Sequence, residues 1–296
     1  MTALRVGLVG AGPWAEAVHA PALAAHARTE LAGVWARRPE AAAAIAKRFG
    51  GAVYEKVDDL IADVEAVAFA VPPAVQGALA VQAAAAGRHL LCEKPLADTA
   101  AAARAVVDAA EAAGVVTAVM LTQRLDPDIE EWLAGLPDGD AGPDTVGLGR
   151  WLSGSLLGGR YAGSAWRQEH GALLDVGPHV IDLLDAALGR VTRVAWAHRD
   201  EPDLWRFALD HAGGAHSSVT ISMRIPIVPS EIEFGVFGGI GDHRLSARAA
   251  DPVACYGRLL DSFAAAVAGD GPAPVLDVAR ALHLQEVIEQ VQAAVR

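Results

Sequence analysis

The sequence predicts a two-domain protein. The first domain is an α/β Rossmann domain with a mostly parallel, doubly wound sheet, and the second is an α+β domain with an open, mainly antiparallel sheet. Three observations predict this. Apolar runs alternate with alanine-rich segments in the first half, glycine directly follows several of those segments, and after the loop at 135–144 the pattern changes to a helix followed by several strands. Parallel strands covered on both faces are apolar throughout, whereas half-buried antiparallel strands alternate. We therefore expect domains at residues 1–121 and 122–296.

The first domain follows a rhythm of strand and helix. Gly50, Gly87 and Gly114 each follow a predicted helix, where a left-handed terminal residue costs glycine least. The expected strands and helices, in chain order, are Leu4–Gly10, Pro13–His26, Leu31–Ala36, Pro39–Phe49, Ala66–Val71, Ala74–Ala86, His89–Cys92, Thr99–Ala113 and Val115–Met120.

The most informative stretch of the second domain is a predicted helix. Asp175 is a suitable N-cap, and Pro178 is tolerated only in the first turn, so the sequence predicts a helix from Asp175 to Leu188 that Gly189 ends. Apolar and polar residues then alternate over 205–210, 218–223 and 231–236, as in strands with one buried face. A helix over Val275–Arg296 closes the chain.

Charge and cysteine usage exclude several classes of function. The net charge is −12, which argues against a nucleic-acid partner because such partners require clustered lysine and arginine. The sequence has no apolar run of the length that spans a membrane. Its two cysteines, Cys92 and Cys255, lie far apart and form no metal-binding motif. We expect a cytoplasmic protein without a structural or catalytic metal.

The first predicted turn carries a dinucleotide-binding pattern. Gly10 and Gly12 fit the form Gly-x-Gly-x-x-Ala, which ends at Ala15, between a predicted strand and a predicted helix. In that context bare backbone can approach a pyrophosphate at the helix N-terminus. The pattern therefore predicts a nicotinamide dinucleotide.

The end of the second strand bears on which dinucleotide is bound. An acidic residue there would accept hydrogen bonds from a ribose 2′-hydroxyl, but this chain has alanine at Ala36 followed by Arg37 and Arg38. A guanidinium group suits a 2′-phosphate, so the sequence favours NADP(H) over NAD(H). The alternative interpretation is that both arginines are solvated turn residues.

Two further features point to chemistry. Lys94 is one of three lysines and follows a buried strand. On the predicted helix, Asp175, His179 and Asp182 project from one face among apolar neighbours, where buried charges must be partnered or line a cleft. The structural alternative is a capping aspartate with a core histidine and one carboxylate that satisfies it.

Together these residues resemble the Gfo/Idh/MocA family of oxidoreductases. The resemblance rests on four segments in order, and covers most of the chain: Gly10-x-Gly12-x-x-Ala15, Pro72-Pro73, Glu93-Lys94-Pro95 and Asp175-x-Gly177-x-His179-x-x-Asp182. It implies a Rossmann domain with a second α+β domain. It also implies that the Lys94–Pro95 peptide bond is cis.

The resemblance also implies roles for individual residues. Lys94 and His179 would be the acid/base pair at the substrate carbinol, with Asp175 orienting the hydroxyl and Trp166 beside the substrate. Gln76 stands where the family frequently has histidine, which puts one contact to nicotinamide or substrate in doubt. The residues expected to bind the cofactor are Gly10, Gly12, Pro13, Trp14, Arg37, Arg38, Val71, Pro72, Glu93, Lys94 and Arg167.

The resulting functional hypothesis is hydride transfer between NADP(H) and a secondary alcohol or ketone of a sugar, cyclitol or similar polyol. Two alternatives stay open. A redox-elimination glycosidase of the same fold would use the same residues, and a dinucleotide-binding sensor would not catalyse at all. The resemblance further implies a homodimer or homotetramer, although Arg206, Asp210, Glu231 and Glu233 make the outer face of the second sheet charged.

Overall fold

The computed structural model describes residues 3–137, 141–158, 162–247 and 250–295, so residues 138–140 of the loop at 135–144 and the terminal Arg296 lie outside the described residues. The chain divides into two compact units. One comprises Met1–Thr122 and Asp251–His283, and the other comprises Gln123–Ala250 and Leu284–Arg296. The domains expected from the sequence therefore need a correction, because residues 251–283 belong to the first unit. Among the described residues, no helix has the length and apolar character required to cross a membrane.

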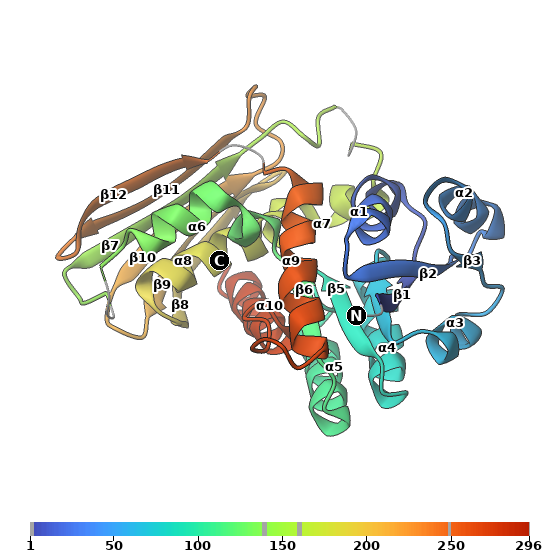
Figure 1. The fold of residues 1–296 in the computed structure, drawn as a ribbon. Helices are drawn as coiled ribbons and strands as arrows, with labels where there is room; N and C mark the ends of the chain where they lie inside the picture. Colours follow the sequence, from blue (N-terminus) through green and yellow to red (C-terminus); the bar gives the residue numbers. More distant parts are fainter. Residues whose placement is uncertain (1–2, 138–140, 159–161, 248–249, 296) are drawn as a thin grey trace. The chain divides into compact units, whose positions relative to one another are not determined.

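The first unit contains a sheet of six parallel strands in the order β3-β2-β1-β4-β5-β6 (Figure 1). The strands are β1 Leu4–Val9, β2 Thr29–Trp35, β3 Ala52–Val53, β4 Ala66–Phe69, β5 His89–Glu93 and β6 Thr117–Met120. The order reverses direction between β1 and β4, which is the place where doubly wound sheets bind ligands outside the carboxyl ends of their strands. The predicted fold class of this domain is confirmed.

Helices connect these strands. They are a π-helical turn Ala15–His19 that runs into α1 Ala20–Ala25, then α2 Pro39–Phe49, α3 Val57–Asp63, α4 Pro73–Ala85 and α5 Ala100–Ala113. The prediction of one regular helix over Pro13–His26 misses the π-helical turn. The prediction also omits β3 and α3, which are too short to show a period in the sequence.

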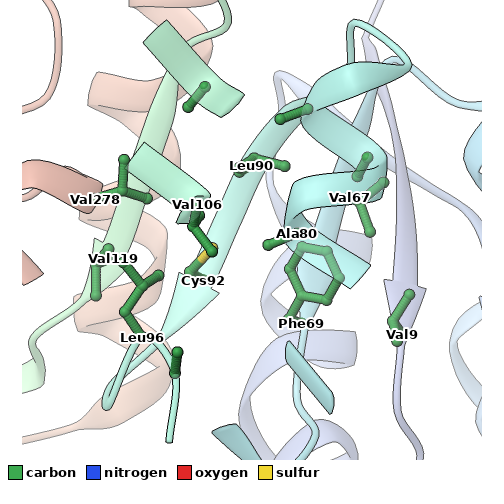
Figure 2. Packing of buried hydrophobic residues seen from close by; sticks show 14 of the residues in the cluster. Val9, Val67, Phe69, Ala80, Leu90, Cys92, Leu96, Val106, Val119 and Val278 are labelled. Carbon is green, nitrogen blue, oxygen red and sulfur yellow. The ribbon is translucent and has the colours of Figure 1, made fainter. Parts of the chain in front are cut away.

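The core of this unit lies between the sheet and its covering helices. Figure 2 shows Phe69 of β4 against Ala80 of α4, and Cys92 of β5 beside Val106 of α5, all of them buried. Burial raises the pKa of the Cys92 thiol far above its ordinary value. Because the middle of β5, Leu90 to Cys92, is buried in this way, the residues that follow the strand start from a fixed position.

Residues 251–283 belong to the first unit because of how they pack. Helix α9, Pro252–Val267, buries one face against α1 and β6 of the first unit, with Tyr256 and Phe263 fully buried. The backbone N–H of Val119 in β6 then donates to the carbonyl of Leu276, at 2.7 Å. Helix α10, Val278–Ala293, begins in this unit. An amphipathic pattern predicts that a helix has a buried face, but not which sheet it covers.

The second unit has a mixed sheet in the order β12-β11-β7-β10-β9-β8. All neighbours are antiparallel except β7 and β10, which are parallel, so the predicted mainly antiparallel sheet is confirmed. Its elements are α6 Pro127–Ala134, β7 Thr145–Leu152, α7 Ala165–Asp175, α8 Gly177–Leu188, β8 Val191–Asp200, β9 Leu204–His211, β10 His216–Ser222, β11 Glu231–Gly238 and β12 Gly241–Ala247. A 3₁₀ turn, Thr122–Leu125, precedes α6.

Helix α8 packs closely on β7. A Cβ atom at Gly147 would lie 2.4 Å from a methyl of Leu188, and one at Gly149 would lie 2.6 Å from a methyl of Val180. Glycine at these two strand positions therefore allows a close approach of helix and sheet. This packing fixes α8, the helix that carries His179 and Asp182.

Candidate active site

The dinucleotide turn directly follows β1. Gly10 has φ +120°, and a Cβ atom there would lie 2.3 Å from the carbonyl oxygen of Ala70, so only glycine fits. Gly12 differs, because, its own chain neighbours aside, no atom of the described residues lies within 4 Å of the position that a Cβ would take. The N–H of Glu16 donates to the Gly12 carbonyl, so Pro13 and Trp14 form the first turn of the helix, as predicted. The turn thus presents open backbone next to a helix N-terminus.

The carboxyl ends of the other parallel strands meet the same edge of the sheet. Val71 and Pro72 follow β4, and a Cβ at Gly10 would lie 3.1 Å from a Val71 methyl. Arg37 and Arg38 follow β2, and both side chains are exposed. The structure therefore brings the predicted cofactor-binding residues of the first unit to one edge.

Glu93 ends β5 at this edge, and Lys94 follows it. The Trp14 Nε1–H donates to Glu93 Oε1 at 2.6 Å, and His19 Nε2 lies 2.9 Å from the same oxygen. Lys94 is half-buried, and its bond to Pro95 is cis, as the resemblance implies. The side chain of Glu93 thus connects the turn that carries Lys94 to the helical segment that follows the dinucleotide turn.

The second unit holds its predicted residues on two helices and not one. Asp175 is the last residue of α7, and the N-cap of α8 is Val176, so the prediction that Asp175 caps the helix of His179 is wrong. The N–H of Val176 donates to the Ala172 carbonyl, which shows that the chain is already helical there. The Asp175 carboxylate instead accepts from Arg167 Nε at 2.8 Å.

All three polar residues of the predicted stripe are buried in the second unit. The exposed fraction is 6% for Asp175, 6% for His179 and 1% for Asp182. Arg124 donates to Asp182 across 3.4 Å, so the two carboxylates each have an arginine partner. The structure therefore pairs the carboxylates of Asp175 and Asp182 with cations, as buried charge requires.

An aromatic ring lies against the candidate acid/base histidine. The Trp151 ring of β7 is stacked on the His179 imidazole, with centroids 5.9 Å apart and an interplanar angle of 29°. Trp166 of α7 contacts His170, at a centroid distance of 5.1 Å, and is half-buried. The stack limits the orientations that the His179 ring can adopt.

Comparison with known proteins decides the family. Residues 4–121 match the Gfo/Idh/MocA oxidoreductase family, described by its NAD-binding Rossmann fold. This part of the chain belongs to the family. The chain is 34% identical over 201 residues to dTDP-3,4-didehydro-2,6-dideoxy-alpha-D-glucose 3-reductase of Streptomyces violaceoruber, covering 66% of this chain and 57% of that protein. It is 38% identical over 107 residues to glucose-6-phosphate 3-dehydrogenase of Bacillus subtilis, covering 36% and 30%.

The fold has solved counterparts within the same range of size. The crystal structure of GenD2 from gentamicin A biosynthesis, in complex with NAD, superposes with a TM-score of 0.85 at 22% identity, covering 99% of this chain and 94% of GenD2. Sequence similarity is more limited in extent, since the matched stretches span less than two thirds of each of the two relatives. Membership of the Gfo/Idh/MocA family therefore rests on the first domain, and the structural likeness extends its fold to the whole chain.

Several residues contact the family motifs through packing that local sequence spacing does not predict. Gln76, His19, Trp151 and Arg124 each contact a predicted site residue from a distant segment. Their partners become neighbours only after packing, so no local spacing could identify them. Gln76, which the family resemblance put in doubt, is buried among backbone groups of the turn that carries Lys94.

A crevice of about 320 Å³ lies beside α7, and none of the predicted site residues lines it. Its lining includes Asp203, Arg224 and Gln168. Asp203 accepts from the N–H groups of Ala172 and Met223, and Arg224 donates to Gln168 at 2.5 Å. Burial raises the pKa of Asp203, while these two hydrogen bonds lower it. Since these polar groups are already paired with one another and with backbone, the crevice supports the structure of α7 and carries none of the predicted chemistry.

Proposed function

We propose that this Gfo/Idh/MocA protein is an NADP(H)-dependent oxidoreductase that interconverts a secondary alcohol and its ketone on a sugar, cyclitol or similar polyol. The observation that carries the proposal is the gathering of Gly10, Gly12, Pro72 and Lys94 at the carboxyl ends of β1, β4 and β5 in one parallel sheet. A lysine is thereby placed at the edge where such sheets bind dinucleotides.

The residues of the first unit fit a bound dinucleotide. Space is open at Gly12, where a side chain would fill the approach of a pyrophosphate, and the helix after it starts at Pro13. Arg37 and Arg38 are exposed beyond β2 and would pair with a 2′-phosphate, which favours NADP(H). When bound, the nicotinamide supplies the hydride acceptor or donor.

The protein's own residues would handle the proton and the hydroxyl. Lys94 and His179 are the proposed acid/base groups at the carbinol, and Asp175, held by Arg167, would orient the hydroxyl. The imidazole is stacked on Trp151, and histidine is the side chain that most often serves as a general acid or base. Trp166 and the Asp175 carboxylate would contribute to substrate binding. The burial of Asp175 and His179 supports these roles, because buried titratable side chains are concentrated at functional sites.

The relatives suggest where on a sugar the reaction takes place. One is named as a 3-reductase of a dideoxy sugar nucleotide and another as a 3-dehydrogenase of glucose 6-phosphate. We therefore propose a ring hydroxyl or ketone at carbon 3 of a pyranose as the first substrate class to test. GenD2 was solved with NAD, whereas the two arginines of this chain favour NADP(H), so both dinucleotides belong in the assay.

The test is a fluorescence titration with NADPH and NADH, followed by a panel of sugars, 3-keto sugars and cyclitols monitored by the absorbance of the reduced nicotinamide. Lys94→Ala and His179→Ala should each lower kcat by about 10²- to 10⁴-fold while the protein still binds NADPH. Lys47→Ala removes an exposed lysine of α2 and is the matched control. Near-normal turnover of either active-site variant would refute the assignment.

Other outcomes of the same assay would favour the alternatives. Sugar release without a net change in the reduced nicotinamide would indicate redox elimination of a glycoside. Tight binding of NADPH with no turnover across the panel would indicate a sensor. Tighter binding of NADH than NADPH would refute the role given to Arg37 and Arg38.

We also propose a cytoplasmic homodimer, with a homotetramer as the larger alternative. The charges on the outer face of the second sheet are largely paired within the chain, because Arg150 bridges Glu231 and Glu233. Trp196 of β8 is 49% exposed and offers apolar surface for a second copy. Both cysteines are free and buried, as suits a reducing compartment. Light scattering across a concentration series measures the assembly, and a monomer at all concentrations would refute it.

A further inference from the structure

Gln76 of α4 is fully buried and is bonded to the turn that carries Lys94. Its amide nitrogen donates to three backbone carbonyls, those of Glu93 at 2.7 Å, Leu96 at 2.9 Å and Pro95 at 3.2 Å. Its amide oxygen accepts from the N–H of Glu93 at 2.9 Å. One side chain therefore holds the main chain on both sides of Lys94.

These hydrogen bonds replace a missing strand neighbour. On the β4 side, pairing of β5 ends at Ala68 with Leu91, two residues before Glu93. Pairing with β6 continues to Glu93 and stops there. The N–H and C=O of Glu93 that face β4 would otherwise be buried without partners, and a carboxamide is the side chain that both donates and accepts. The Gln76 amide thus supplies the two hydrogen bonds that a neighbouring strand would otherwise make to Glu93, the last residue before Lys94.

The approach of α4 to the turn is itself adapted to this contact. The neighbouring residue is Gly77, and a Cβ atom there would lie 3.0 Å from the Cβ of Ala97, just beyond the turn. A larger residue would push the helix and the turn apart. The glycine therefore keeps Gln76 within hydrogen-bonding distance of the turn.

We propose that Gln76 is a positioning residue for the reaction, because its four hydrogen bonds fix the backbone from which the Lys94 side chain extends. This inference rests on the proposed role of Lys94 in proton transfer. Displacements of about 1 Å in a catalytic group can cost on the order of 10²-fold in rate, so loss of this support should act on turnover more than on binding.

The experiment compares Gln76→Glu, Gln76→Met and Gly77→Ala with Gln82→Ala. Glutamate keeps the size and the acceptor but loses the amide donors, while methionine removes both. Gly77→Ala leaves the amide intact and presses α4 against Ala97. Gln82 lies on the same helix, is exposed and donates to the exposed Asp58 carboxylate, so its variant is the matched control.

For each variant, kcat and KM are measured across pH with the best substrate, together with the Kd for NADPH and the melting temperature. We expect the two Gln76 variants to lower kcat about 10- to 100-fold and to shift its pH profile, with the Kd for NADPH nearly unchanged. Gly77→Ala should lower kcat in the same sense, and Gln82→Ala should match the parent.

The outcomes separate this inference from the proposed function. If folded Gln76 and Gly77 variants keep the kcat and pH profile of the parent while Lys94→Ala loses turnover, Gln76 is structural and the inference is wrong. If Lys94→Ala itself retains turnover, it is the proposed function that fails. Should the Gln76 variants not fold, Gly77→Ala decides, because it creates no unpaired polar group.

Discussion

The two candidate half-sites are held in different ways. In the first unit, the main chain on both sides of Lys94 is held by an uncharged amide, Gln76, while the neighbouring Glu93 carboxylate contacts Trp14 and His19. In the second unit, Asp175 and Asp182 are fixed by ion pairs with Arg167 and Arg124. Neutral hydrogen bonds in the interior hold at any pH at which the protein is folded, whereas a buried ion pair depends on both charges. The second half-site should therefore be the more sensitive to loss of one partner.

The largest loss of stability and activity is expected when the ion pair between Arg167 and Asp175 is broken. Arg167→Met leaves the buried Asp175 carboxylate without the guanidinium charge, and breaking such a pair costs about 3 to 5 kcal/mol of unfolding free energy. If Asp175 orients the substrate hydroxyl, kcat/KM should also fall by about 10- to 100-fold, because hydrogen bonds to charged groups are worth that much. Urea unfolding and steady-state kinetics measure the two effects.

A double variant distinguishes charge from packing at this pair. Arg167→Met combined with Asp175→Asn removes both charges, so most of the lost stability should return while turnover stays low. If the double variant is as unstable as Arg167→Met, the cost arises from packing of the arginine stem, and the contrast between the two half-sites weakens.

In the first unit, the dinucleotide turn depends on backbone geometry at two glycines and not on an ion pair. Gly12→Ala meets no protein atom and should fold normally, but its methyl lies where the dinucleotide backbone would approach, so the Kd for NADPH should rise about 10-fold or more. Gly10→Ala clashes with the Ala70 carbonyl at positive φ and should lose about 1 to 3 kcal/mol of stability. Calorimetry for stability and fluorescence for binding separate the two glycines. Equal affinity of Gly12→Ala and the parent would contradict the cofactor assignment of the turn.

A smaller effect is expected at the His179 ring, where the second unit uses stacking in place of charge. Trp151→Ala removes the stacked ring, which is worth about 0.5 to 1.5 kcal/mol, so kcat should fall by about 3- to 10-fold. Trp151→Phe keeps an aromatic face and should recover most of that loss. If Trp151→Ala lowers stability but leaves kcat unchanged, the stack serves only to pack β7 against α8.

The sequence predicts the parts of this site that depend on local pattern. The parallel strands are recognisable because strands buried on both faces are apolar throughout, and Gly10, Gly12 and Lys94 can be found because they directly follow such strands. His179 and Asp182 follow from helical spacing, which α8 preserves.

What the sequence does not predict depends on tertiary packing. The sequence pattern places Asp175 on the wrong helix, because a proline in a first turn does not reveal whether the preceding residues are already helical. Gln76 and Trp151 act on partners that only folding brings near. Helix α9 joins the first unit because its apolar face fits α1 and β6, a matter of complementarity that no single segment encodes.

The smallest predicted effect concerns two histidines and is shared by both units. Burial lowers the pKa of His89 in the first unit and of His211 in the second. His89 Nδ1 accepts from the Val116 N–H, and the two His211 nitrogens contact Gly189 and Ser217. The folded protein therefore resists protonating these rings, whereas the unfolded chain protonates them at the ordinary histidine pKa of about 6.5. Below that pH the unfolded state binds more protons, so the unfolding free energy falls as pH decreases.

Replacing each ring by an uncharged amide tests this sign. His211→Gln and His89→Gln should each lose less unfolding free energy than the parent between about pH 7.5 and about pH 5.5, because the glutamine does not titrate. Between about pH 7.5 and about pH 8.5, where free histidine is already neutral, variants and parent should change alike. An equal acid dependence in parent and both variants would contradict the assignment. A reduced dependence in only one would show that the two units differ in their response to acid as well as in how they hold their half-sites.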